Sequence, residues 1–179
     1  MRTLSALSAV VLVLFLIGAP LADGRENPLP RLVVLNIELT GDAGGPKFEE
    51  EHRERIQKES VMLREELAHS GLYQVLDNDP ARSLIDKLTS QQRYLHDCNG
   101  CDLDIGKQLG ADEVMVVWID RVSALILSLT YEIHDVRTQQ IVDRKSFDLR
   151  GDNDAAWTHA IQFMVRDLKE RGGKAGRAG

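Results

Sequence analysis

Apolar residues along the 179-residue chain occur in two patterns that predict strands. Continuous apolar runs, such as RLVVLNIEL at 31–39 and EVMVVWI at 113–119, are typical of strands buried on both faces. Strict alternation over residues 122–136 instead predicts a strand with one buried and one solvent-facing side. The predicted strands are residues 31–39, 72–76, 113–119, 122–136 and 141–149.

Apolar residues at helical spacing predict the remaining elements. The predicted helices are residues 48–70, a helix that begins at Pro80, residues 103–109 and residues 155–170. In this order the first βαβ unit implies a right-handed parallel crossover, and the last three strands imply an antiparallel meander. We therefore expect an α/β (α+β) fold, with a single mixed five-stranded sheet covered by helices.

Residues 1–24 have the organisation of a secretory signal peptide. Arg2 precedes an apolar run from Val10 to Ile17, which a helix-breaking Gly-Ala-Pro follows. This run is too short to span roughly 30 Å of hydrocarbon, which requires about 20 apolar residues. Small residues predict cleavage after Gly24, with Ala22 as a second candidate, and an uncleaved anchor is the alternative. The segment has no Cys to accept a lipid, so we expect the mature chain to be soluble and outside the cytoplasm, in an oxidising compartment, without stable membrane insertion.

Composition limits the partners of the remaining chain. Residues 25–170 have the length of one domain, and the Gly-rich tail at 171–179 is expected to be disordered. The formal net charge is −6, whereas nucleic acid and anionic lipid select clustered Lys and Arg. We therefore expect no nucleic-acid partner.

Cys98 and Cys101 are the only two cysteines, and in an exported chain such a close pair predicts a structural disulfide. A redox-active pair needs a stabilised thiolate, which the helix beginning at Leu103 favours. Three neighbouring aspartates oppose that thiolate. A zinc site needs two further ligands, and only His96 is close in sequence. Redox and metal-handling roles therefore remain as alternatives.

No other motif indicates catalysis. The five histidines are scattered, and the chain contains neither HExxH nor GxSxG. The glycine-rich residues 41–45 follow a predicted strand but lack the Lys-Ser/Thr of a phosphate loop. The aspartate pairs near residues 102 and 152 do not continue into a calcium loop, and helix capping explains them better. We expect no catalytic residues, no bound metal and no cofactor.

The meander is the expected docking region for a partner. Its free edge has unpaired backbone groups that accept an added strand. The helix from Glu49 to Glu66 is highly charged, so its desolvation is costly. The residues predicted to face solvent and contact the partner are Ser128, Thr130, Glu132 and His134.

From residue 72 onward the chain resembles the N-terminal domain of TolB, the related fold of CsgG and lipoprotein activators of penicillin-binding proteins. The segments that carry the resemblance are GLYQVLD at 71–77, the cysteine pair, IGKQLGAD at 105–112 and the strand-turn-strand at 127–138. Gln139 stands where such domains often have Gly. A closer likeness is to small uncharacterised exported proteins that consist of this domain alone. The resemblance implies a Gram-negative periplasmic setting and a fold without catalytic residues.

These patterns together predict a non-enzymatic accessory or adaptor protein that binds another envelope or periplasmic protein. The first alternative is a thiol-disulfide or metal-handling role at Cys98 and Cys101. The second is an accessory role, as a small-ligand carrier, in a periplasmic quinoprotein dehydrogenase pathway.

Overall fold

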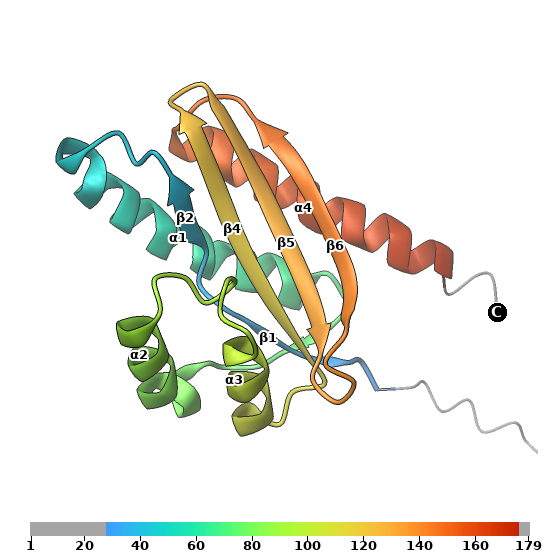
Figure 1. The fold of residues 1–179 in the computed structure, drawn as a ribbon. Coiled ribbons are helices and arrows are strands. Elements are labelled where there is room, and N and C mark those ends of the chain that lie inside the picture. Colours follow the sequence, from blue (N-terminus) through green and yellow to red (C-terminus); the bar gives the residue numbers. More distant parts are fainter. Residues whose placement is uncertain (1–27, 176–179) are drawn as a thin grey trace, which may run out of the picture.

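A mixed sheet separates two helical layers in the computed structural model, which describes residues 28–175 (Figure 1). The predicted signal peptide lies outside the described residues. The strands are β1 (Arg31–Val34), β2 (Glu38–Gly41), β3 (Gln74–Val75), β4 (Glu113–Ser123), β5 (Ile126–Asp135) and β6 (Ile141–Leu149). The helices are α1 (Glu49–His69), α2 (Arg82–Gln91), α3 (Cys101–Leu109) and α4 (Asp154–Ala175), with 3-10 turns at Pro46–Phe48 and Asp79–Ala81.

The sheet has the predicted mixed character. Its strand order is β3-β1-β4-β5-β6, and β2 pairs with β4 beyond the end of β1. β1 runs parallel to β3 and β4, whereas β4, β5 and β6 form the antiparallel meander. The mixed sheet covered by helices is therefore confirmed. Within residues 28–175 no helix is both long enough and apolar enough to cross a membrane.

The first predicted strand, residues 31–39, is divided in two, so the sheet has six strands where five are predicted. β1 and β2 pair with the same edge of β4, but Leu35 to Ile37 lie opposite only Val116 and Val117. One extra residue is a bulge, which interrupts regular pairing and bends the strand. The continuous apolar run conceals this bulge, because it lacks the alternation that would show a change of face.

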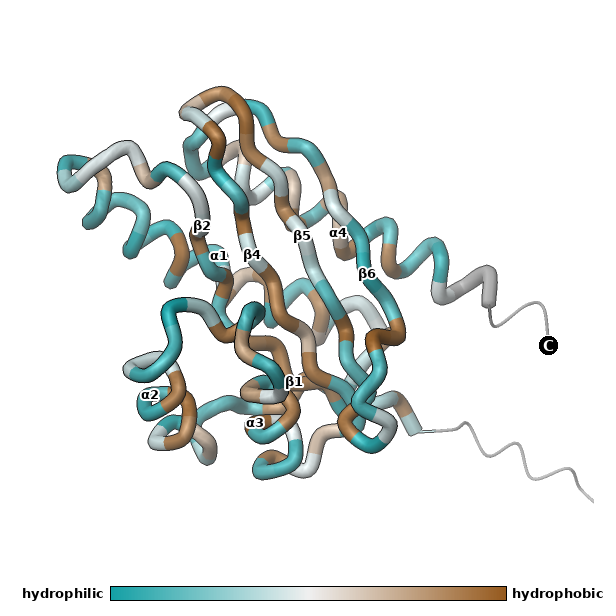
Figure 2. The backbone as a smooth tube through the Cα atoms, in the orientation of Figure 1, coloured by the Kyte–Doolittle hydropathy of each residue, from teal (hydrophilic) through white to brown (hydrophobic). Residues whose placement is uncertain are grey.

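The two sheet faces carry separate cores because side chains alternate along each strand. α1 and α4 cover one face, and the predicted stripe of α4 lies there. Its residues Trp157, Ile161, Met164 and Leu168 are 0%, 0%, 0% and 5% exposed, which confirms that stripe. α2 and α3 cover part of the other face, where Ile105 packs with Val114 and Val116. Figure 2 shows hydrophobic colour along β4 between these layers and again at the tip of the β4–β5 hairpin.

The C-terminal helix extends further than predicted. Residues 171–175 belong to α4 rather than to a disordered tail, and residues 176–179 lie outside the described range. Arg171 explains the extension, because its Nε lies 2.9 Å from Asp167 Oδ2 one turn earlier. Its Nη2 also lies 2.9 Å from Asp143 Oδ2 of β6, which ties this end of the helix to the sheet.

Candidate functional site

The four polar residues predicted to contact a partner lie along β5, on the sheet face that α2 and α3 cover only at one end (Figure 1). Thr130 and Glu132 are 7% and 9% exposed, so this face is less open than the alternation predicts. Neighbouring strands bury them, because Thr130 Oγ1 lies 2.8 Å from Ser146 Oγ and Glu132 Oε1 lies 3.0 Å from Arg144 Nη1. The other two residues are half-buried. Partner contact by Ser128, Thr130, Glu132 and His134 stays a prediction.

His134 joins β5 to α3. Its Nδ1 lies 2.5 Å from Asp102 Oδ2, and its Nε2 lies 3.0 Å from Glu132 Oε2. The hydrogen bond with Asp102 raises the pKa of His134, and burial opposes the rise less strongly. Both ring nitrogens are occupied by carboxylates, so the imidazole has no free position from which to act as a base. The sequence does not reveal this link, because Asp102 and His134 belong to separate elements.

The cysteine pair lies where the chain enters α3. Cys98 and Cys101 are joined in a disulfide with their Cα atoms 5.5 Å apart. His96, the metal ligand considered from sequence, stacks on Trp118 with ring centroids 4.5 Å apart. Its Nδ1 lies 2.5 Å from Glu38 Oε2. Within the described chain no group of three or more His, Cys, Asp or Glu side chains is placed to hold a metal ion.

A buried charge cluster connects α1, β4 and the start of α4, and the sequence gives no sign of it. The carboxylate of Asp152 lies 2.8 Å from His52 Nε2, 3.0 Å from Arg55 Nη1 and 2.6 Å from Arg121 Nε. Burial alone raises the pKa of Asp152, but the hydrogen bonds from His52 and Arg121 outweigh it and hold that pKa below its usual range. The three donors share one carboxylate, whereas His52 Nδ1 is buried without a hydrogen-bond partner among the described residues. Because the charges compensate one another in the protein interior, we assign the cluster a structural role. The capping residue of α4 is Asn153, whose Oδ1 accepts a hydrogen bond from the Ala156 amide at 3.0 Å.

β6 provides the long unpaired sheet edge that the sequence predicts. Among residues 28–175 no strand pairs with its outer side. It is nine residues long, whereas β2 and β3 at the opposite edge have four and two residues. An unpaired strand presents backbone N–H and C=O groups at every second residue. β6 is therefore the longest stretch of the sheet that is open to a further strand.

An apolar hollow of about 410 Å³ lies between β6 and α4. Phe147 of β6 and Phe163 of α4 meet there edge to face, with ring centroids 5.5 Å apart. Phe163 is 43% exposed, which is unusual for a large aromatic side chain. The lining residues are Phe147, Asp148, Leu149, Arg150, Ala156, His159, Ala160 and Phe163. The free edge and the hollow together form a groove beside a strand, which we call the β6–α4 groove.

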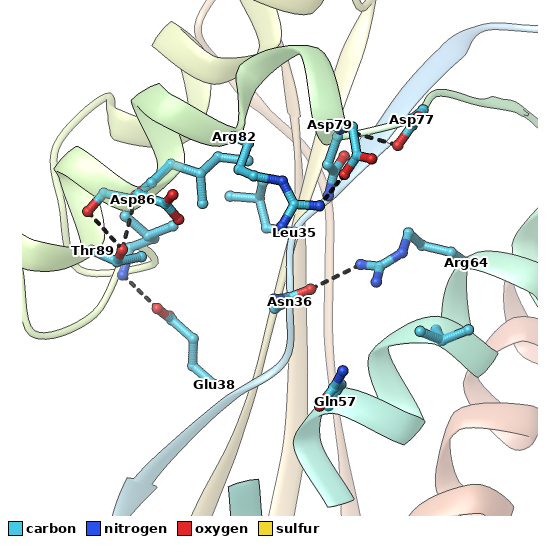
Figure 3. A pocket seen from close by; sticks show the side chains of 14 residues that line it. Leu35, Asn36, Glu38, Gln57, Arg64, Asp77, Asp79, Arg82, Asp86 and Thr89 are labelled. Carbon is cyan, nitrogen blue, oxygen red and sulfur yellow. Dashed lines mark hydrogen bonds and ion pairs between the residues drawn. The ribbon is translucent and has the colours of Figure 1, made fainter. Parts of the chain in front are cut away.

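A second hollow of about 410 Å³ lies where β1 and β3 end (Figure 3). Its walls come from the bulge between β1 and β2, from α1 and from α2. Arg64 of α1 points toward Asn36 of the bulge, and Arg82 of α2 pairs with Asp79. We call this second hollow the strand-end pocket. The sequence does not predict it, because its walls are assembled from distant segments.

Solved structures similar to this chain include those of LpoB and TolB. The NMR structure of LpoB from E. coli is 13% identical with a TM-score of 0.49, and the match covers 85% of each chain. The LpoB C-terminal domain from Salmonella enterica is 15% identical with a TM-score of 0.45, covering 72% of this chain and 87% of that chain. TolB from Acinetobacter baumannii is 12% identical with a TM-score of 0.41, covering 76% of this chain and 27% of TolB.

In sequence, no curated protein matches the chain. A family model matches residues 30–168, a range from just before β1 into the last turns of α4. The chain belongs to the DUF3280 family, which is described as "Protein of unknown function (DUF2380)".

Proposed function

We propose that this protein is a non-enzymatic accessory protein of the periplasm that binds an extended segment of another envelope protein in the β6–α4 groove. The observation that carries the proposal is a nine-residue free strand edge beside an apolar hollow. An added strand satisfies its backbone groups on the edge, and its alternate side chains enter the hollow.

The groove is held in a fixed shape by ion pairs between its two walls. Lys145 Nζ of β6 lies 2.7 Å from Asp167 Oδ1 of α4, and Asp143 Oδ2 lies 2.9 Å from Arg171 Nη2. A fixed groove lowers the ordering cost of binding, because only the incoming segment loses conformational freedom. The charges on β6 also oppose indiscriminate pairing between edges, which favours a selected partner.

The chemistry of the groove indicates what the partner segment contains. Phe147, Leu149 and Phe163 provide apolar surface, so the segment needs an apolar side chain at every second position. The polar residues of β5 lie two strands from the incoming segment, so contacts to them come from parts of the partner that extend over the sheet face. A second copy of this chain is the competing occupant.

The periplasmic setting rests on the signal-like pattern of residues 1–24. N-terminal sequencing of protein from a periplasmic extract should give a chain that begins between Asp23 and Arg25. A product that keeps Met1 and sediments with the inner membrane would contradict this part of the proposal.

Site-specific photocross-linking tests the docking site. Benzoylphenylalanine at position 163 should cross-link a partner in intact cells, whereas the same group at Glu54 of α1 should not. Phe163→Glu should remove capture and leave the domain folded, with only a modest loss in melting temperature, because that side chain is 43% exposed and packs on Phe147 at one edge. Hydrogen exchange on the captured complex should show new protection at every second amide of β6.

Two results would overturn the proposal. Cross-links concentrated on α1, with unchanged exchange in β6, would place the partner on the other side of the molecule. A cross-linked product that contains only this chain would assign the groove to a second copy.

A further inference from the structure

The strand-end pocket occupies a position where α/β sheets commonly bind ligands. β1 and β3 are neighbouring parallel strands, and their carboxyl ends open into it. The helix after β1 and β2 packs on one sheet face, while the helices after β3 pack on the other. Ligands of open α/β sheets bind in the crevice at such a divergence. The pocket volume of about 410 Å³ lies within the range of small-molecule sites.

At the floor of the pocket, side chains make the hydrogen bonds that a neighbouring strand would otherwise make at the end of β1. β3 leaves β1 after Leu32, so the Val34 carbonyl is not paired with a neighbouring strand. Asn78 Nδ2 donates to that carbonyl at 2.9 Å, and Arg64 Nη1 approaches it at 3.4 Å. Asn78 Oδ1 is then buried without a hydrogen-bond partner among the described residues. A buried acceptor of this kind is costly unless a donor reaches it.

Arg64 is the unpaired cation of the pocket. Its Nη1 lies 3.0 Å from Asn36 Oδ1, which directs the guanidinium into the space between α1 and α2 (Figure 3). Within residues 28–175 no carboxylate lies within ion-pair distance of it, and Nε and Nη2 remain for another acceptor. A half-buried guanidinium without an anion retains a desolvation cost that a bound carboxylate would offset.

Acidic side chains line the same pocket, and the charge of Asp77 acts on Arg64 across it without an ion-pair contact. Asp79 is engaged by Arg82, whereas in the part of the chain that the structure describes Asp77 accepts only the Asp79 amide, at 3.0 Å. Asp77 faces the pocket from the segment after β3, and Arg64 faces it from α1 (Figure 3). The lining carries two arginines and four acidic residues, which disfavours phosphates and other multiply charged anions. The acidic residues are Glu38, Asp77, Asp79 and Asp86.

The cation Arg64, the anion Asp77 and the buried acceptor Asn78 Oδ1 are together complementary to one class of small molecule, which carries a carboxylate and an ammonium group. We propose that the strand-end pocket binds a free α-amino acid, with its carboxylate on Arg64 and its ammonium group on Asp77 and Asn78 Oδ1. The apolar wall formed by Leu35, Ile85 and Leu95 receives an aliphatic or aromatic side chain. This site is separate from the β6–α4 groove, so its failure would leave the partner proposal untouched.

Calorimetric titration with free L-leucine and L-phenylalanine tests the site on the whole mature chain. Arg64→Gln and Asp77→Asn should each weaken binding about tenfold or more, because each removes the charge that faces the oppositely charged group of the ligand and leaves at most a weaker neutral hydrogen bond. Arg53→Gln is the matched control, since Arg53 lies on the same helix, pairs with Glu50 at the surface and is absent from the pocket lining. It should bind as the wild type does.

Ligand analogues on the unmodified protein make the test independent of mutant folding. N-acetyl-L-leucine lacks the ammonium group and L-leucinamide lacks the carboxylate, so both should fail to bind where leucine binds. The proposal is overturned if none of the twenty common amino acids binds at about 10 mM. Equal binding of either analogue, or undiminished binding by a folded Arg64→Gln variant, would also overturn it.

Discussion

Asp152→Ala should be among the most destabilising single substitutions in this domain. The carboxylate is 7% exposed and accepts hydrogen bonds from His52, Arg55 and Arg121, which are themselves buried. Removing it leaves three donors, two of them permanently charged, without their shared anion. Breaking a buried ion pair from one side costs about 3–5 kcal/mol. For a domain of this size, that cost lowers the melting temperature by roughly 6–20 °C.

Urea unfolding followed by circular dichroism measures the loss in the free energy of unfolding. Asp154→Ala is the control, because it removes an exposed carboxylate in place of a buried one. Asp154 contacts Arg55 of that cluster from the solvent side: its Oδ1 lies 2.8 Å from Arg55 Nε, and its side chain is 54% exposed. An exposed pair contributes about 1 kcal/mol or less, so the control should cost much less than Asp152→Ala. The comparison separates the effect of burial from the loss of a negative charge near the start of α4.

The pH dependence provides a second check on the same residue. The folded-state pKa of Asp152 is depressed, so its contribution is present above the unfolded pKa of about 3.9 and is lost as the pH falls through the folded value. The stability gap between wild type and Asp152→Ala should therefore narrow below about pH 4. A loss no larger than that of Asp154→Ala, or a gap that does not change with pH, would refute the reasoning.

Three further predictions concern the hairpins and the disulfide. Gln139 has φ +60°, so Gln139→Gly should raise the free energy of unfolding by about 0.5–1 kcal/mol in thermal melts, and a decrease would contradict this. The double substitution Cys98→Ser and Cys101→Ser should cost about 2 kcal/mol, because the closed loop is short, yet leave a folded domain by circular dichroism. Loss of partner capture at unchanged stability would favour the redox alternative. The raised pKa of His134 stabilises the fold below its unfolded value of about 6.5, and this is lost as pH rises through the folded value. The stability gap between wild type and His134→Gln should therefore be larger at pH 5.5 than at pH 8, and the same gap at both would argue against the Asp102 contact.

Periodic patterns predicted the parts of the fold that depend on one element at a time. The α4 stripe is an example, because Trp157 and Ile161 recur at helical spacing and a helix can bury only one such side. The order of strands and helices likewise led to the mixed sheet, since chain connections are short and right-handed. Gln139 stands where similar domains often have Gly. In the structure its φ is +60°, a left-handed conformation that is unfavourable for a residue other than glycine.

The features that sequence patterns missed depend on pairs of distant residues. His52 and Asp152 are 100 positions apart, and nothing in their local surroundings distinguishes them from a solvated His and a helix cap. The bulge after β1 adds one residue within an apolar run, so hydropathy does not show it. The strand-end pocket depends on that bulge together with Arg64 and Asp77, which only the folded chain brings together.

The parallel pairing of β1 has a consequence for the order in which the chain folds. Arg31 and Asp112, at the start of this pairing, are 81 positions apart, whereas β4, β5 and β6 are joined by short turns. Local contacts form faster than distant ones, so the meander is expected to fold first and β1 to join it late. In a chain that emerges N-terminus first, the leading segment therefore has no partner until most of the domain has been made. That delay leaves β1 unfolded, which is the state in which a polypeptide can be threaded through a narrow export channel.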